Sequence, residues 1–174
     1  MKQKIGVSTP PEIRKVEDVL KVMREAKKQG LDFVEFNCTD VPPMSPKLLS
    51  PKEKERLREN AESLGLGIAI HGSNDINLIS LNPTLREFAV SYIEESLKFA
   101  RYLNAELLNT HAGTILQYYS RNRFLYFDEL FDYSSIFQES LKKLAILGEE
   151  YGVLICIENT SRRTNKLLVE GMQA

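Results

Sequence analysis

The chain has 174 residues, of which 43% are hydrophobic, and its 23 basic and 24 acidic residues nearly cancel. This composition can bury a sizeable core, so we expect one domain over residues 1–174. Near-neutral charge gives no global reason to bind nucleic acid or an anionic membrane surface. The N-terminus lacks a signal-peptide core, and no run approaches the ~20 apolar residues of a membrane span. Cys38 and Cys156 fit no paired metal spacing, so we expect reduced thiols in a cytoplasmic protein.

Short apolar runs alternate with longer helical patterns, which is typical of repeated βα units and a parallel sheet. We expect strands near residues 4–8, 32–36, 66–71, 106–111 and 153–158. A first helix is predicted from apolar residues at three- and four-residue spacing, namely Val16, Val19, Leu20, Met23 and Ala26. Gly30 follows as its stop signal.

Three further helices are predicted. The second begins with Ser50, Pro51 and Glu53, which is the pattern of a capping box with proline at the first helical position. The third follows Asn82 and Pro83, and the fourth covers about 135–151. The expected core stripe of the third helix comprises Leu85, Phe88, Ala89, Tyr92, Leu97, Ala100 and Leu103.

Polar residues end three of the expected strands. The runs LGIAIH, ELLNTH and VLICIE end at His71, His111 and Glu158, and the chain has no other histidine. Because strand side chains alternate between faces, Asn109 shares a face with His111, while the bulky aliphatic residues face the helices. Glu35 ends the second strand in the same way and is a fourth candidate. This pattern predicts a barrel-like sheet with a metal site at its carboxyl-end mouth.

The connection from residue 112 to 133 is long and rich in tyrosine and phenylalanine. A connection of this length is typically functional or disordered, and its aromatic content argues against disorder. One interpretation is a lid over the mouth, in which Arg121 and Arg123 meet a phosphate or carboxylate of a substrate. The other is a satellite aromatic cluster with solvated arginines.

Three segments together resemble a known family: HGSNDINLISLNPTLREF from His71, NTHAG around His111, and CIENT around Glu158. They are similar to the xylose-isomerase-like TIM barrels, a superfamily shared by sugar isomerases and epimerases and by endonuclease-IV-type abasic-site nucleases. The resemblance implies a (βα)8-type α/β barrel, of which this chain covers about the first five βα units. A full barrel usually has ~250 residues. We therefore favour a piece of a longer protein over a half-barrel that closes as a homo-oligomer.

The isomerase branch is the favoured function. There the resemblance implies that Glu158 binds one divalent cation, among Mn, Mg, Co and Zn, and moves a proton next to a carbonyl of a sugar or sugar phosphate. His71, His111 and Glu35 would orient substrate hydroxyls, with Asn109 and Asn159 beside them. Asn159 could instead orient Glu158. The assignment to carbohydrate metabolism follows from this branch.

Two alternatives stay open. In the nuclease branch the resemblance makes His71, His111 and Glu158 zinc ligands for phosphodiester hydrolysis. The IENT segment favours that branch, whereas the DFVEF strand favours the isomerases, and Asn74 stands where nuclease relatives often carry a DNA-probing tyrosine. Near-neutral charge also weakens the case for a nucleic-acid partner. The third alternative is a noncatalytic partial-barrel binding protein, which predicts no turnover even with metal.

Overall fold

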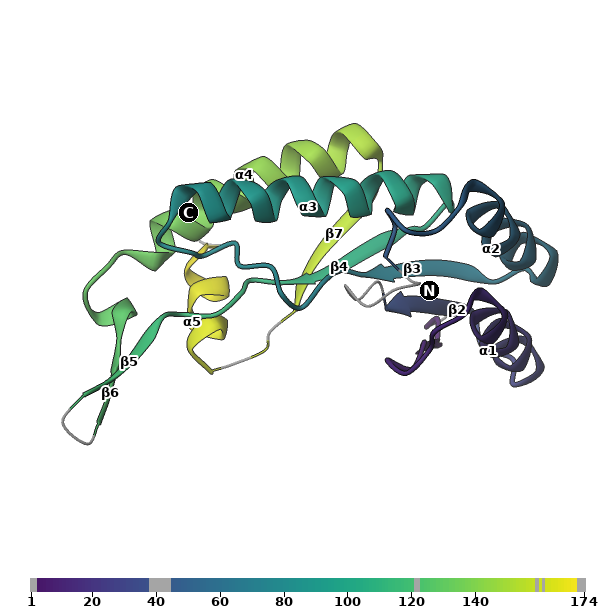
Figure 1. The fold of residues 1–174 in the computed structure, drawn as a ribbon, viewed down its shortest axis with the longest axis horizontal. Helices are drawn as coiled ribbons and strands as arrows, with labels where there is room; N and C mark the ends of the chain where they lie inside the picture. The colour runs from purple at the N-terminus through teal and green to yellow at the C-terminus, as the bar shows by residue number, and fades with distance from the viewer. Residues whose placement is uncertain (1–2, 38–44, 121–122, 159, 161, 172–174) are drawn as a thin grey trace.

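Five parallel strands form the central sheet, in the order β1-β2-β3-β4-β7 (Figure 1). The computed structural model describes residues 3–37, 45–120, 123–158, 160 and 162–171. The strands are β1 (Gly6–Ser8), β2 (Phe33–Asn37), β3 (Gly67–His71), β4 (Leu107–His111) and β7 (Leu154–Glu158). All five strands expected from the sequence are present. Consecutive parallel strands joined by crossover helices confirm the α/β class of a TIM-type barrel with about five βα units.

The helices begin and end where the sequence signals indicate. They are α1 (Val16–Lys28), α2 (Pro51–Leu64), α3 (Pro83–Tyr102), α4 (Tyr133–Tyr151) and α5 (Arg162–Gly171). At the start of α2, the Glu53 N–H donates to Ser50 Oγ at 3.3 Å, and the Ser50 N–H donates to Glu53 Oε2 at 2.8 Å. This confirms the predicted capping box. None of the helices within the described residues is long and apolar enough to cross a membrane.

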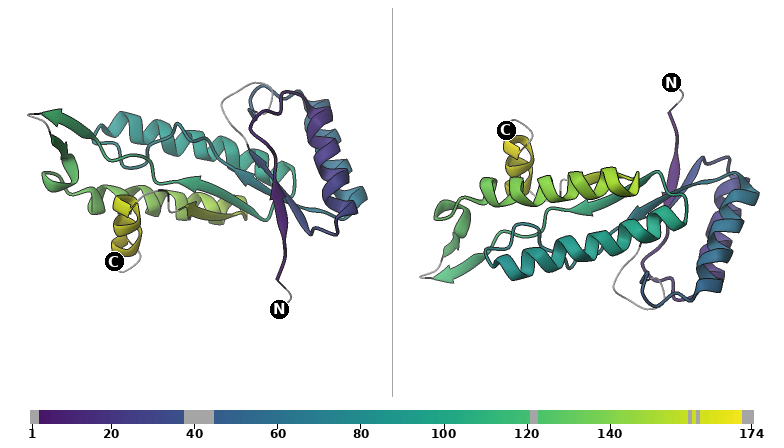
Figure 2. Two further views of the ribbon diagram at one scale, coloured as in Figure 1. Left: turned by 90° about the horizontal axis from the view of Figure 1, so that it is seen from below. Right: turned by 90° about the horizontal axis from the view of Figure 1, so that it is seen from above.

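The core lies between the sheet and the helices of its outer face (Figure 2). Ile68, Ile70 and Leu108 are almost completely buried there, as the strand alternation predicts. Leu85 and Phe88 are 56% and 64% exposed, so their predicted place in the core is wrong. For Leu85, in the first turn of α3, the reason is length: the 20 residues of α3 span about 30 Å, whereas the five of β3 span about 17 Å. Phe88 is exposed because it lies about 100° around the helix from the neighbouring Ala89, which is only 1% exposed.

The aromatic connection forms a hairpin. Its strands β5 (Gln117–Ser120) and β6 (Arg123–Tyr126) pair antiparallel, and the short 3-10 helix η1 (Phe127–Glu129) follows. The hairpin extends away from the sheet beyond the carboxyl ends of its strands (Figure 1). The rings of Tyr119 and Phe124 lie 5.1 Å apart and are both more than half exposed. The hairpin thus corresponds more closely to the satellite cluster than to a cover over the mouth.

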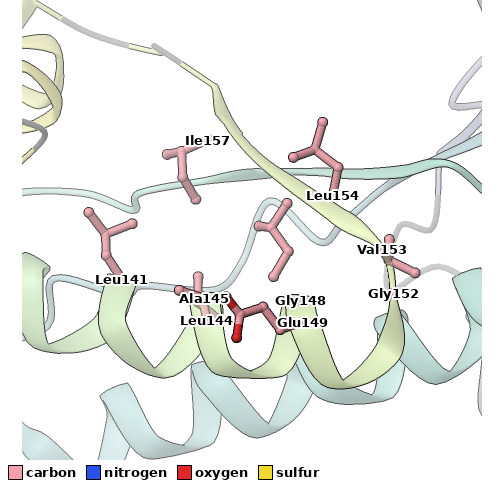
Figure 3. Close-up of a pocket in the computed structure, with 10 residues that line it drawn as sticks. Leu141, Leu144, Ala145, Gly148, Glu149, Gly152, Val153, Leu154 and Ile157 are labelled. Carbon is pink, nitrogen blue, oxygen red and sulfur yellow. The ribbon is translucent and has the colours of Figure 1, made fainter.

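Strand β7 lies at one edge of the sheet, and an apolar groove runs between it and α4 (Figure 3). The groove has a volume of about 610 Å³, and Leu141, Leu144 and Ile157 line it. Leu154 of the same strand is 65% exposed. At the opposite edge, Ile5 before β1 is 59% exposed. Both edges of the sheet therefore present apolar side chains to solvent.

Candidate metal centre

Three neighbouring strands bring His71, His111 and Glu158 together at the carboxyl-end edge of the sheet. In the strand register His71 pairs with Asn109, and His111 pairs with Glu158. One ligand atom from each of the three side chains lies within 4.8 Å of the other two, and the histidine ring centroids are 5.0 Å apart. Ligands of a tetrahedral zinc ion lie about 3.3 Å apart, from bond lengths of ~2.0–2.1 Å. Side-chain shifts of about an ångström would therefore close the cluster around an ion.

Hydrogen bonds fix the orientation of His71 and Glu158. The Nδ1 of His71 lies 2.9 Å from the Gly72 carbonyl oxygen, which can only accept, so Nδ1 carries the proton. Its Nε2 then presents a lone pair at 3.4 Å from Glu158 Oε2. Asn109 Nδ2 donates to the same Oε2 at 3.1 Å. The arrangement resembles the hydrogen-bonded support around ligand side chains in metal sites.

His111 has the properties of a neutral ligand. Its Nε2 is buried and has no hydrogen-bond partner among the described residues. Burial lowers the pKa of His111, His71 lowers it further, and the Glu158 carboxylate raises it in part. A neutral imidazole with an unused ring nitrogen is the form that binds a cation. The residues present therefore fit a divalent metal ion with nitrogen and oxygen ligands.

The loops after β3 and β4 hold the edge that carries the cluster. Gly72 N–H donates to the Asn109 carbonyl oxygen at 2.7 Å. Further out, Asn77 Nδ2 donates to the Thr114 carbonyl at 2.9 Å. Gly113 has a φ of +107°, and a Cβ there would collide with Asn77. These contacts lock the two loops together directly behind the two histidines.

The remaining predicted site residues lie at different distances from the cluster. Glu35 pairs with Ala69, which precedes His71 by two residues on β3. Glu35 therefore lies one layer below the mouth. Asn109 supports Glu158 from the neighbouring strand. Arg123 is exposed on the projecting hairpin, and its contact with a substrate stays a prediction. Asn159 and Arg121 lie outside the described residues.

Sequence reasoning missed Asn37, which pairs with His71 in the strand register. We expected the second strand to end at 36 with Glu35 as its last inward residue, but β2 continues to Asn37. The signal was available, because Asn37 has the same parity as Glu35 and follows it by one strand period.

A parallel sheet with outer helices and a polar cluster at its carboxyl edge defines a barrel protein of the TIM class with a candidate metal centre. The chain belongs to the xylose isomerase-like TIM barrel family, whose family model matches residues 23–171.

Comparison with known proteins gives relatives of several kinds. The uncharacterized protein MJ1311 of Methanocaldococcus jannaschii is 29% identical over 112 residues, which are 64% of this chain and 36% of that protein. A D-tagatose 3-epimerase-like protein of known structure has a TM-score of 0.72 at 22% identity, covering 98% of this chain and 60% of its own. Endonuclease IV from Thermus thermophilus has a TM-score of 0.56 at 23% identity, covering 90% and 51%. The chain thus spans about a third of the archaeal relative and between half and three fifths of these two structures.

Proposed function

We propose that the protein is a divalent-metal-dependent isomerase or epimerase of sugars or sugar phosphates. The observation that carries the proposal is the cluster of His71, His111 and Glu158 at the edge where barrel enzymes hold their active sites. The epimerase-like structural neighbour supports this class. We also propose that residues 1–174 form a single barrel-type domain, since one core cluster includes residues from Val16 to Leu167.

A divalent ion bound at this cluster would supply Lewis-acid polarisation of a substrate carbonyl, which makes the neighbouring C–H more acidic. His71 and His111 would hold the ion through ring nitrogens, and Glu158 through a carboxylate oxygen. The amide of Asn109 donates to Glu158 Oε2, which leaves Oε1 to take a proton from carbon and return it. Asn109 would keep the carboxylate in place during that transfer.

Solvent exchange tests the proposed chemistry directly. The protein would be incubated in D2O with Mn²⁺ and D-tagatose, and deuterium at the carbon next to the carbonyl would be followed by NMR. We expect metal-dependent exchange in the wild type and roughly a hundredfold loss or more in Glu158→Gln, because the amide cannot accept the proton. Exchange that survives this substitution would contradict the role of Glu158, and no exchange with any sugar tested would contradict the isomerase class.

The ligand set favours one second candidate, an endonuclease-IV-type abasic-site nuclease. Two imidazoles beside one carboxylate suit Zn²⁺ better than Mg²⁺, and endonuclease IV shares the fold. Zinc-dependent cleavage of a duplex that contains one abasic site, together with no deuterium exchange in sugars, would support this candidate. Metal binding without either activity would leave the noncatalytic binding protein.

A further inference from the structure

The inner face of β2 ends in an amide side chain directly beside the candidate metal centre. Asn37 is the last residue of β2, and it pairs with His71 across the β2–β3 ladder. Paired residues of adjacent strands point to the same face, and neighbouring strands lie about 4.8 Å apart. Asn37 and His71 are therefore neighbours on the face that carries the cluster, whereas Glu35 lies one layer lower.

The backbone at Asn37 is anchored. Its N–H donates to Thr9 Oγ1 at 2.9 Å, and Thr9 is only 3% exposed. The Thr9 N–H in turn donates to the Glu35 carbonyl oxygen at 2.8 Å. The Asn37 side chain thus starts from a fixed point at the mouth, held by the segment that follows β1.

The side-chain oxygen of Asn37 is unsatisfied. Asn37 Oδ1 is buried and has no hydrogen-bond partner among the described residues. A buried acceptor without a donor destabilises the folded state, and proteins retain such groups mainly where a ligand or a bound water completes them. His71 does not complete it with Nδ1, because that nitrogen already faces the Gly72 carbonyl.

We propose that Asn37 is a positioning residue that accepts a hydrogen bond from an O–H group held beside the metal ion. This inference rests on the proposed function. The O–H donor has two sources with the same chemistry, a hydroxyl of a bound sugar and a water molecule on the ion. In either case the amide fixes the orientation of the donor relative to His71 and Glu158.

Asn37→Leu tests the proposal because leucine has a similar volume but no acceptor. Unfolding temperature and binding of Mn²⁺, first alone and then with D-tagatose, would be measured on the full chain. We expect the unfolding temperature without ligand to stay unchanged or to rise, since the unsatisfied acceptor is gone. We expect about a 3- to 10-fold loss of affinity, the usual effect of one neutral hydrogen bond.

Comparison of the two affinities distinguishes the two sources of the O–H group. A loss confined to D-tagatose binding identifies a sugar hydroxyl, and a loss already present with Mn²⁺ alone identifies water on the ion. Asn37→Asp keeps an acceptor oxygen and should retain D-tagatose binding. A lower unfolding temperature in Asn37→Leu with both affinities unchanged would show a purely structural role and overturn the proposal.

Asn60→Leu is the matched control. Asn60 lies on α2, away from the carboxyl edge, and its Oδ1 is likewise buried without a partner among the described residues. Its replacement should change stability in the same direction and leave both affinities unchanged. If the wild type binds neither Mn²⁺ nor D-tagatose, the proposed function fails and this inference fails with it. If the wild type binds both and Asn37→Leu binds equally well, only the inference fails.

Discussion

The chemistry of the candidate centre depends on a few side chains whose orientation is set by hydrogen bonds. Glu158 is 43% exposed, so its carboxylate would rotate freely without the contact from Asn109 at 3.1 Å. His71 is held by the Gly72 carbonyl, and His111 by burial. Ligand affinity at this edge should therefore respond to residues that never contact the ion.

Asn109→Leu provides the first test at this scale. Loss of its hydrogen bond to Glu158 should weaken Mn²⁺ binding by about 10- to 100-fold, the usual effect of removing a group that supports a ligand. Thr110→Val is the control, because Thr110 is fully buried on the opposite face of the same strand. Isothermal titration calorimetry of both variants checks this, and equal affinities in the two would contradict the role of Asn109.

A second residue-scale prediction concerns pH. Burial, followed by the influence of His71, lowers the pKa of His111 below its ordinary value of 6.5. The unfolded chain therefore binds this proton more readily than the folded chain, so stability is retained above about pH 6.5 and declines as the pH falls below it. Unfolding temperatures between about pH 7.5 and 5 should show this decline in the wild type and a flatter profile in His111→Gln. Parallel profiles would contradict the prediction.

At the scale of elements, the sequence predicted which side chains meet at the carboxyl edge of the sheet. It did not predict the boundary of β2 or the exposure of Phe88 on α3. Alternation along β3, β4 and β7 places His71, His111 and Glu158 on one face, and parallel pairing brings one face to one edge. The same rule predicts that Asn37 lies at this edge only if β2 is extended to residue 37. Element boundaries are the part of a structure that local sequence patterns predict least well. Phe88 is 64% exposed beside Ala89 at 1%, so the face of α3 that meets the core is narrower than its apolar residues indicate.

The loops behind the histidines carry the third prediction. Gly113→Ala places a Cβ against Asn77 in a backbone conformation that L-residues avoid. Gly30 also has a positive φ, of +75°, but a Cβ there meets nothing within 4 Å. Gly30→Ala should therefore cost about 1 kcal/mol of stability from the backbone alone. Gly113→Ala should cost more and also weaken Mn²⁺ binding, because Gly113 follows His111 by two residues.

Urea unfolding and Mn²⁺ titration of the two glycine variants measure these effects. An equal loss of stability in both, with unchanged metal affinity in Gly113→Ala, would show that the Asn77 contact does not support the centre.

At the scale of the whole molecule, the edges of the sheet decide how the chain behaves in solution. An edge strand with free backbone groups and exposed apolar side chains promotes pairing with another chain. Strand β7 has this character, with Leu154 exposed and the groove against α4 beside it. We therefore predict that residues 1–174 associate as the concentration rises.

Leu154→Lys places a charge on this edge and should shift the chain toward monomer with little loss of stability. Ile146→Lys is the control, since Ile146 on α4 is equally exposed at 65%. Light scattering coupled to size-exclusion chromatography reports the mass of each. A wild-type chain that stays monomeric at all concentrations, or an identical effect of both variants, would contradict the role of the β7 edge.

The measurement that tests the central claim most directly is a Co²⁺ titration followed by visible absorption. We predict that one Co²⁺ binds per chain, with d–d bands of a site that includes imidazole nitrogen, and that His111→Ala and Glu158→Gln each abolish the bands. Absence of binding, or binding that persists unchanged in both variants, would show that His71, His111 and Glu158 do not form a metal centre.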